Sequence, residues 1–193
     1  MPEIPRYENP QWTIDGYWHG SGVWVPGMIN NETYLISAPQ YAYGAVVYYA
    51  PYIMEATAAY RGYSLKDYQD GIALMSPSDL GKTVWLRRPG GDWEGPFLVV
   101  DCARRHDMFP AVYYRREIAE LGFETAVAWG LAKYGGKGNN GRWTALSWIL
   151  DNVEVWVGDE PPDNPGRPID YVNWWLWQIE WATKIEERVY PDD

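Results

Sequence analysis

The feature that most constrains the fold is a pair of short β-rich runs separated by a strong turn signal. Residues 84–86 (Val-Trp-Leu) and 97–100 (Phe-Leu-Val-Val) flank a Pro-Gly-Gly sequence at 89–91. Runs of this kind, bounded by Pro and Gly, predict two short strands. Asp101 follows the second run directly, so an acid stands at the end of an otherwise apolar strand. Such an acid is either a capped structural group or a reactive one.

Other segments complete a mainly β pattern. Residues 45–49 and 152–157 are rich in β-branched and aromatic side chains, which predicts a strand over each. A strand is predicted over 124–129 and a short strand over 33–36, whereas residues 53–59 could form a strand or a short helix. A small helix is predicted over 113–121 and ends at Gly122. Residues 64–70 are predicted as a loop and residues 133–141 as a long hairpin loop. About six to eight short strands with one small helix favour a closed β-barrel.

Both ends of the chain differ from its middle. Residues 1–40 are rich in Pro, Gly, Asn and Trp without a clear period, which predicts an extended N-terminal arm. The barrel domain is expected over 41–158, and the Pro-rich residues 159–169 read as a linker. Residues 170–193 are predicted as an amphipathic C-terminal helix, because apolar residues recur at helical spacing from Val172 to Val189.

The C-terminal helix carries an unusually broad apolar face. Trp174, Trp177 and Trp181 form a second stripe beside the first. A face this broad predicts docking on the barrel or on a second copy of the chain, so a homo-oligomer formed through this helix is one expectation. Glu180, Glu186 and Glu187 occupy its polar face and disfavour an interfacial membrane helix.

Composition narrows the choice of partners. The net charge of −10 argues against nucleic acid, whose phosphates require a basic surface. No window approaches 18 uninterrupted apolar residues, so no membrane span is predicted, and residues 1–12 do not form a signal peptide. His19 and His106 are the only histidines and Cys102 the only cysteine, without carboxylates at ligand spacing, so neither a metal site nor a cofactor is predicted. By strand alternation Cys102 faces away from Asp101 and is interpreted as a small buried hydrophobe.

Aromatic side chains are the compositional outlier, with 13 Trp and 16 Tyr against 3 Phe. Rings with a polar group suit half-hydrated surfaces, including surfaces that stack on sugar rings, although many such rings simply fill a core. The candidate ligand-binding platforms are Trp85, Trp93, Tyr113, Tyr114 and Trp129.

The order of these elements resembles a known family. Strands over 45–49, 84–86 and 97–101, a small helix over 115–121 and a terminal strand over 152–157 resemble the six-stranded double-psi β-barrel of the rare lipoprotein A and expansin group. The resemblance spans residues 45–159 and rests on the apolar run that ends in Asp101, followed by REIAELGF. It implies action on cell-wall glycans such as peptidoglycan, and an extracellular or envelope location.

The resemblance also shows where this chain departs from the family. In rare lipoprotein A proteins a His in a T-A-A-H-K-T-L-P segment pairs with an Asp on the later strand. Asp101 matches that Asp, but Met75 stands at the position of the His and cannot transfer a proton. The family's second Asp, in a D-L-S motif that opens the small helix, is matched here by Val112. The resemblance therefore implies the fold more strongly than the activity.

Asp107 and His106 are candidate replacements for the missing groups. Both follow Asp101 closely, on a predicted loop over the same groove. Two carboxylates in different environments can divide general acid and general base roles. Alternatively, Arg104 and Arg105 neutralise the acids in a surface network.

Three functional hypotheses follow. The first is recognition of cell-wall polysaccharide without the family's catalysis, through stacking aromatic rings. The second is glycan cleavage of the lytic transglycosylase type with Asp101 as proton donor, assisted by Asp107 or His106. The third is a structural or assembly role of the Trp-rich C-terminal helix.

Overall fold

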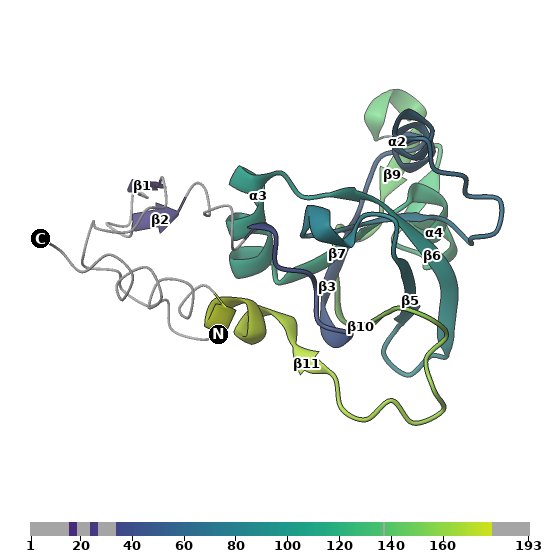
Figure 1. Ribbon diagram of the computed structural model, residues 1–193. Coiled ribbons are helices and arrows are strands. Elements are labelled where there is room, and N and C mark those ends of the chain that lie inside the picture. The colour runs from purple at the N-terminus through teal and green to yellow at the C-terminus, as the bar shows by residue number, and fades with distance from the viewer. Residues whose placement is uncertain (1–15, 19–23, 27–33, 137, 179–193) are drawn as a thin grey trace, which may run out of the picture.

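The computed structural model describes residues 16–18, 24–26, 34–136 and 138–178. Six strands of this described part close into a mixed β-barrel (Figure 1). They pair in the order β10-β5-β6-β4-β7-β3, and β10 also pairs with β3, which closes the barrel. The β4–β6 and β3–β7 pairs are parallel and the other four are antiparallel. The barrel strands are β3 (Tyr41–Tyr48), β4 (Gly71–Leu74), β5 (Thr83–Arg87), β6 (Trp93–Cys102), β7 (Glu117–Leu121) and β10 (Leu150–Val157).

Smaller elements decorate the barrel. β1 (Gly16–Trp18) pairs with β2 (Trp24–Pro26), β8 (Ala132–Tyr134) forms a hairpin with β9 (Trp143–Ala145), and β11 (Ile169–Asp170) adds in parallel to β3. The helical segments are α2 (Ile53–Arg61), the 3₁₀ helix η1 (Pro77–Asp79), α3 (Arg105–Phe109), the π-helical η2 (Pro110–Tyr114), α4 (Phe123–Ala128), the 3₁₀ turn η3 (Asn139–Gly141) and residues 171–178. No helix among the described residues is long and apolar enough to cross a membrane.

The strands predicted from β-branched runs are confirmed. Val84 and Leu86 of β5 are fully buried, as are Val153 and Val155 of β10, because alternate side chains of a strand point into the barrel. The predicted loop over 64–70 and the hairpin loop between β8 and β9 are also confirmed. Residues 53–59, which the pattern left open, are helical.

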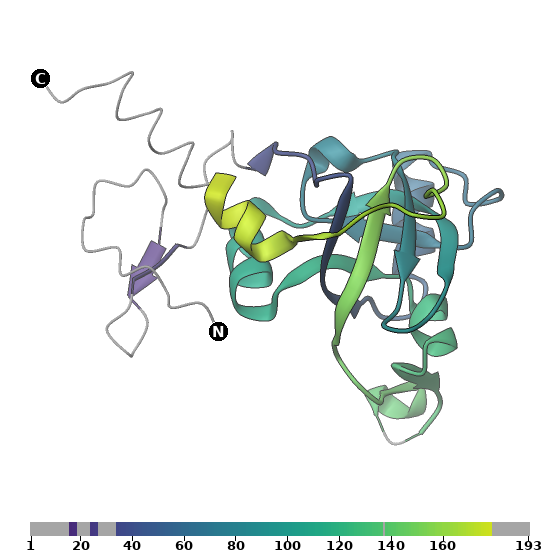
Figure 2. The same ribbon diagram turned by 90° about the horizontal axis from the view of Figure 1, so that it is seen from below.

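The C-terminal helix docks on the barrel over its described part. Trp175 is fully buried in the barrel core, and its ring centroid lies 5.7 Å from that of Phe109 in α3. Tyr171 and Val172 are buried in the same cluster. Figure 2 shows residues 171–178 beside the segment that contains α3. The predicted stripe beyond residue 178, including Trp181 and Val189, lies outside the described residues.

Two local predictions are wrong. The helix predicted over 113–121 is instead the end of η2 followed by strand β7, and the strand predicted over 124–129 is helix α4. β7 lies between β3 and β4, so backbone pairing on both sides outweighs the helical spacing of Ile118 and Leu121. The amide and hydroxyl of Thr125 in the first turn of α4 both donate to the buried carboxylate of Asp70, which supports a helix at this point. No strand forms over the described residues 34–36.

Candidate functional site

A cavity of about 780 Å³ lies between α2, the end of β6, and the segment formed by α3 and η2. Its charged lining consists of Arg61, Asp101, Arg104, Asp107, Arg115 and Glu120. Three tyrosines, Tyr34, Tyr49 and Tyr60, also contribute to its wall. The cavity therefore combines acids, guanidinium groups and amphipathic rings around Asp101.

Asp101 reaches this cavity through an irregularity in the strand pairing. Ile72 of β4 pairs with Val99 of β6, but the next residue, Ala73, pairs with Asp101, so β6 has one extra residue. A β-bulge of this kind changes which face of the sheet a side chain occupies. Ala73 and Val100 both pack in the small cluster that also contains Met54 and Ala58 of α2. The bulge therefore turns Asp101 toward α2 and into the cavity.

Glu120 is the second acid of the site, and the sequence analysis did not select it. Ala73 pairs with Asp101 on one side and with Glu120 of β7 on the other. Residues opposite one another on paired strands project to the same face of a sheet. Asp101 and Glu120 consequently flank Ala73 on the same face, about 10 Å apart between their Cα atoms because two strand spacings separate them.

The hydroxyl of Tyr49 connects the two acids. It donates to Oδ2 of Asp101 at 3.3 Å, and it lies close enough to Glu120 for each of the two groups to shift the pKa of the other. Burial raises the pKa of Tyr49 far above its ordinary value, so the hydroxyl keeps its proton. Because a phenol has a single proton, donation to Asp101 competes with donation to Glu120.

The environments of the two acids differ. Burial raises the pKa of Glu120 above its ordinary value, while the hydrogen bond with Tyr49 opposes the shift and the charge of Glu117 adds to it. Asp101 instead accepts a hydrogen bond from Nη2 of Arg61 at 2.9 Å. Glu120 is thus favoured in its protonated form, whereas Asp101 is paired with the guanidinium group of Arg61. This is the arrangement that separates an acid role from a carboxylate role.

A second ion pair closes the β7 side of the site. Arg115 lines the cavity and its guanidinium binds both carboxylate oxygens of Glu117, which is only 1% exposed. The hydrogen bond with Glu117 raises the pKa of Arg115. The pair places two opposite charges near Glu120: the carboxylate of Glu117 raises the pKa of Glu120, and the guanidinium of Arg115 lowers it by less.

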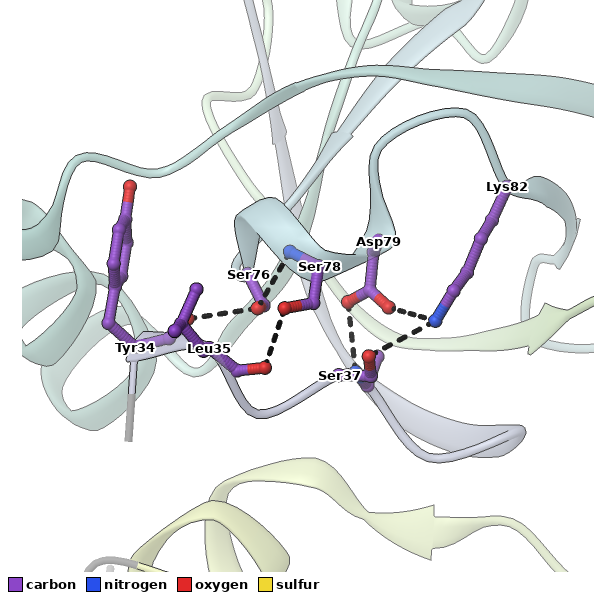
Figure 3. A network of polar contacts seen from close by, with 8 residues as sticks. Tyr34, Leu35, Ser37, Ser76, Ser78, Asp79 and Lys82 are labelled. Carbon is purple, nitrogen blue, oxygen red and sulfur yellow. Dashed lines mark hydrogen bonds and ion pairs between the residues drawn. The ribbon is translucent and has the colours of Figure 1, made fainter. Parts of the chain in front are cut away.

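Tyr34 forms the opposite wall and is held there by a polar network, shown in Figure 3. Its hydroxyl donates to the carbonyl of Ala103 at 2.8 Å. Its own carbonyl accepts from Ser76 at 2.9 Å, and the carbonyl of Leu35 accepts from Ser78 at 2.7 Å. The segment before β3 is therefore hydrogen-bonded to Ser78 of η1 and to its N-cap residue Ser76, which lie about forty positions further along the chain.

The anchor of this network is Asp79, which is completely buried. Its carboxylate accepts from the amide of Ala38 at 2.9 Å and from the ammonium group of Lys82 at 2.7 Å. Lys82 also donates to the hydroxyl of Ser37 at 3.1 Å. A buried carboxylate is stable only with such partners, so the strap formed by residues 34–38 is a fixed part of the site.

Cys102 lines the same cavity beside Asp101. Its thiol lies 3.8 Å from the hydroxyl of Tyr34, and burial raises its pKa. A raised pKa suppresses the thiolate, which is the nucleophilic form. The expectation that Cys102 is a buried residue facing away from Asp101 is wrong, because Cys102 is only half-buried and lines the same cavity.

The structure brings only some of the predicted residues together. Asp107 lies in α3 and lines the cavity with Asp101. The backbone of His106 lies in the same helix, but its side chain lies outside the described residues. Arg104 lines the cavity as well, so the acids and basic residues of the 101–107 segment share one site.

The five aromatic candidates are not among the residues that line this cavity. Trp85, Trp93 and Trp129 lie near the β5–β6 hairpin, where Arg87 covers the ring of Trp93 and Arg88 that of Trp129. Tyr113 and Tyr114 are in η2, where Tyr113 stacks on Phe109 at 5.1 Å. Their role in ligand binding stays a prediction.

The two positions taken from the family pattern require one correction. Met75 is 1% exposed in the core and is not among the cavity-lining residues, so this position contributes no proton-transfer group. Val112, the position matched to the second acid, is a fully buried residue of η2, and the small helix expected to follow it is wrong, because a strand stands there. The short helix after that strand is α4, and Glu120 with Leu121 and Gly122 stands at its opening. The acid was missed because the strand was predicted as a helix.

No group of acids, histidines and cysteine that would hold a metal ion occurs among the described residues. No family model matches the chain, and neither a curated protein nor a solved structure shows significant similarity to it.

Proposed function

We propose that this protein cleaves cell-wall polysaccharide, with Glu120 and Asp101 as its acid and carboxylate. The observation that carries the proposal is that Asp101 and Glu120 flank Ala73 on paired strands and line the same cavity, where Tyr49 donates to Asp101. Because two strand spacings separate the Cα atoms by about 10 Å on one face of the sheet, the side chains can bring the two carboxyl groups closer than that. Glycan-cleaving enzymes use carboxyl pairs at separations of about 5–9 Å.

The roles follow from the two environments. Glu120, whose pKa burial raises, donates its proton to the glycosidic oxygen as the bond from that oxygen to the sugar carbon breaks. Asp101, paired with Arg61, stabilises the positive charge that develops on the sugar ring. The oxygen of a hydroxyl group then bonds to that sugar carbon and gives its proton to Glu120, which returns to its acid form, so bonds and protons balance. This assignment gives Asp101 a different role from the proton donor expected from the sequence.

The double-psi resemblance supports the choice of substrate. A closed six-stranded barrel with Asp101 at the end of β6 and an acid at the opening of the following short helix agrees with the pattern of the rare lipoprotein A and expansin group. On this reading the partner is a wall glycan, and the protein acts in the cell envelope or outside the cell. The negative net charge of −10 favours an uncharged or weakly charged polymer.

Recognition without cleavage is the second candidate. It is favoured by the burial of Met75, which leaves the position of the family's histidine without a proton-transfer group. In that case the tyrosines of the cavity wall bind the polymer by stacking, and the acids serve only as hydrogen-bond acceptors for sugar hydroxyl groups.

The test is incubation with purified peptidoglycan and, separately, cellulose, followed by assay of bound protein and of soluble sugar. Glu120→Gln and Asp101→Asn are expected to bind like the wild type and to lose release by about 10²-fold or more. Asp92→Asn, an exposed acid in the turn between β5 and β6, is the matched control. Binding by the wild type without release of sugar favours recognition alone. Release that survives both cavity substitutions overturns the assignment.

A further inference from the structure

One wall of the cavity is a single face of helix α2. The residues of α2 that line the cavity recur at the spacing of one helix face, namely Ile53, Ala56, Thr57, Tyr60 and Arg61. The adjacent face, with Met54 and Ala58, is buried against strands β4 and β6. Up to Arg61 the wall is therefore uncharged, and it ends in the ring of Tyr60, which is 91% exposed.

Most charged groups of the cavity already have a partner. Arg61 is paired with Asp101 at 2.9 Å, and Arg115 is paired with Glu117. Burial raises the pKa of Glu120, which favours its uncharged form. These groups therefore offer a ligand little net charge.

Arg104 is the exception among the lining residues. Its side chain is exposed, and within the part of the chain that the structure describes its guanidinium group makes neither an ion pair nor a hydrogen bond. The backbone amide of Asp107 donates to the carbonyl of Arg104, but no ion pair joins the two side chains. The cavity thus contains one positive charge that the described residues leave unpaired.

The backbone that carries this charge is fixed. The amide of Ala103 donates to the carbonyl of Leu74 at 3.1 Å, and the carbonyl of Ala103 accepts from the hydroxyl of Tyr34 at 2.8 Å. The carbonyl of Arg104 accepts from the amides of Asp107 and Met108 at 2.8 and 3.0 Å. A charge on a fixed backbone binds its partner at a smaller cost in conformational entropy.

An unpaired guanidinium group in a cavity favours a ligand with an anionic group. The parallel N–H donors of a guanidinium group match the two oxygens of a carboxylate. A single unpaired cation suits one isolated carboxylate, whereas the net charge of −10 disfavours a polymer with a run of phosphates. The uncharged wall of α2 suits the remainder of the sugar unit, because a sugar ring also has an apolar C–H face.

We propose that Arg104 is a specificity-determining residue that selects sugar units bearing a carboxylate. The inference rests on the proposed function for the identity of the ligand as a wall polysaccharide, but not on its cleavage. Of the two polymers tested above, peptidoglycan carries carboxyl groups and cellulose does not. The inference therefore assigns the cavity to an acidic wall glycan rather than to a neutral one.

The experiment measures sedimentation of the full chain with purified peptidoglycan, freed of phosphate-containing polymers, before and after its carboxyl groups are converted to neutral amides. Amidation is expected to weaken binding of the wild type about fivefold or more. Arg104→Gln is expected to bind the untreated polymer as weakly as the wild type binds the amidated one, and to be insensitive to amidation. Arg142→Gln, which removes an exposed arginine of the β8–β9 hairpin outside the cavity, is the matched control and is expected to behave like the wild type.

The outcomes separate this inference from the proposed function. If amidation leaves wild-type binding unchanged, or weakens the wild type and Arg104→Gln equally, the inference is overturned and the cleavage assignment stands. An equal loss of binding in Arg142→Gln shows a general effect of charge and also overturns it. A loss of binding confined to Arg104→Gln, with no sugar released by the wild type, supports the inference and overturns cleavage. A wild type that does not bind untreated peptidoglycan overturns both.

Discussion

The hydroxyl of Tyr49 donates to Oδ2 of Asp101 at 3.3 Å, from the residue that directly follows strand β3. Tyr49 and Glu120 also shift the pKa of one another, so one phenol acts on acids from two different strands of the barrel. Burial raises the pKa values of both Tyr49 and Glu120, so both side chains hold their protons more firmly in the site than they would in water. The state of the site therefore depends on Tyr49.

Replacement of Tyr49 by Phe tests this dependence. The hydrogen bond with Tyr49 lowers the pKa of Glu120, so its loss is expected to raise that pKa further. The measurement is an NMR titration of the Glu120 side-chain carboxyl in the wild type and in Tyr49→Phe. Tyr60→Phe is the control, because Tyr60 lines the same cavity but is 91% exposed. A Glu120 pKa that falls in Tyr49→Phe contradicts this dependence.

The raised pKa of Glu120 also predicts how stability changes with pH. The folded protein binds this proton more tightly than the unfolded chain, whose ordinary value is 4.5. Below pH 4.5 both states are protonated, and as the pH rises through the folded-state pKa the unfolded state ionises first and stability falls. Glu120→Gln lacks this loss, so its stability relative to the wild type is expected to increase with pH by about 1.4 kcal/mol per unit of pKa difference.

Urea denaturation between pH 4 and pH 8 measures the effect of Glu120→Gln. Glu160→Gln, at an exposed position after β10, provides the matched control for removal of one negative charge. The expectation fails if the two variants show the same dependence on pH.

Asp79 is expected to control access to Cys102. Asp79→Ala leaves the Ala38 amide and the Lys82 ammonium group without their acceptor, at a cost of about 1–3 kcal/mol, and releases the strap that carries Tyr34. Because the chain contains a single cysteine, the rate of iodoacetamide alkylation reports on this thiol alone. The rate is expected to rise several-fold in Asp79→Ala and in Tyr34→Ala, and to stay unchanged in Asp92→Asn. Equal rates in all four proteins mean that the strap does not cover the thiol.

Gly122 is expected to tolerate no side chain. A Cβ at this position would lie 2.2 Å from Oδ2 of Asp70, the carboxylate that accepts from both the amide and the hydroxyl of Thr125. Gly122→Ala must displace Asp70 and its hydrogen bonds, which is expected to reduce the free energy of unfolding by about 1–3 kcal/mol. Gly91→Ala is the control, because its Cβ would meet nothing closer than 3.5 Å. Thermal denaturation compares the two, and equal melting temperatures refute the expectation.

Prediction from the sequence succeeded where a segment's own pattern agrees with its surroundings. The runs 84–86 and 97–100 form strands because alternate residues, such as Val84 and Leu86, enter the barrel core. Prediction failed over 117–121 and 124–129, where the local spacing indicates one structure and the neighbouring elements impose another. Propensity differences of a few tenths of a kcal/mol per residue are smaller than the effect of pairing with two strands or of a buried cap.

The sequence by itself determined that the chain forms a closed β-barrel, that an acid ends one of its strands, and that an apolar C-terminal helix begins after a Pro-rich segment. These properties are local, because hydrophobic periodicity and turn residues act over a few positions. Only the tertiary structure decided that Glu120 lines the same cavity as Asp101 and that Tyr34 and Tyr49 contribute to its wall. The two acids meet because β6 and β7 both pair with β4 and β6 has a bulge beside Ala73. Such contacts depend on strand order and register across the whole barrel, which no local pattern specifies.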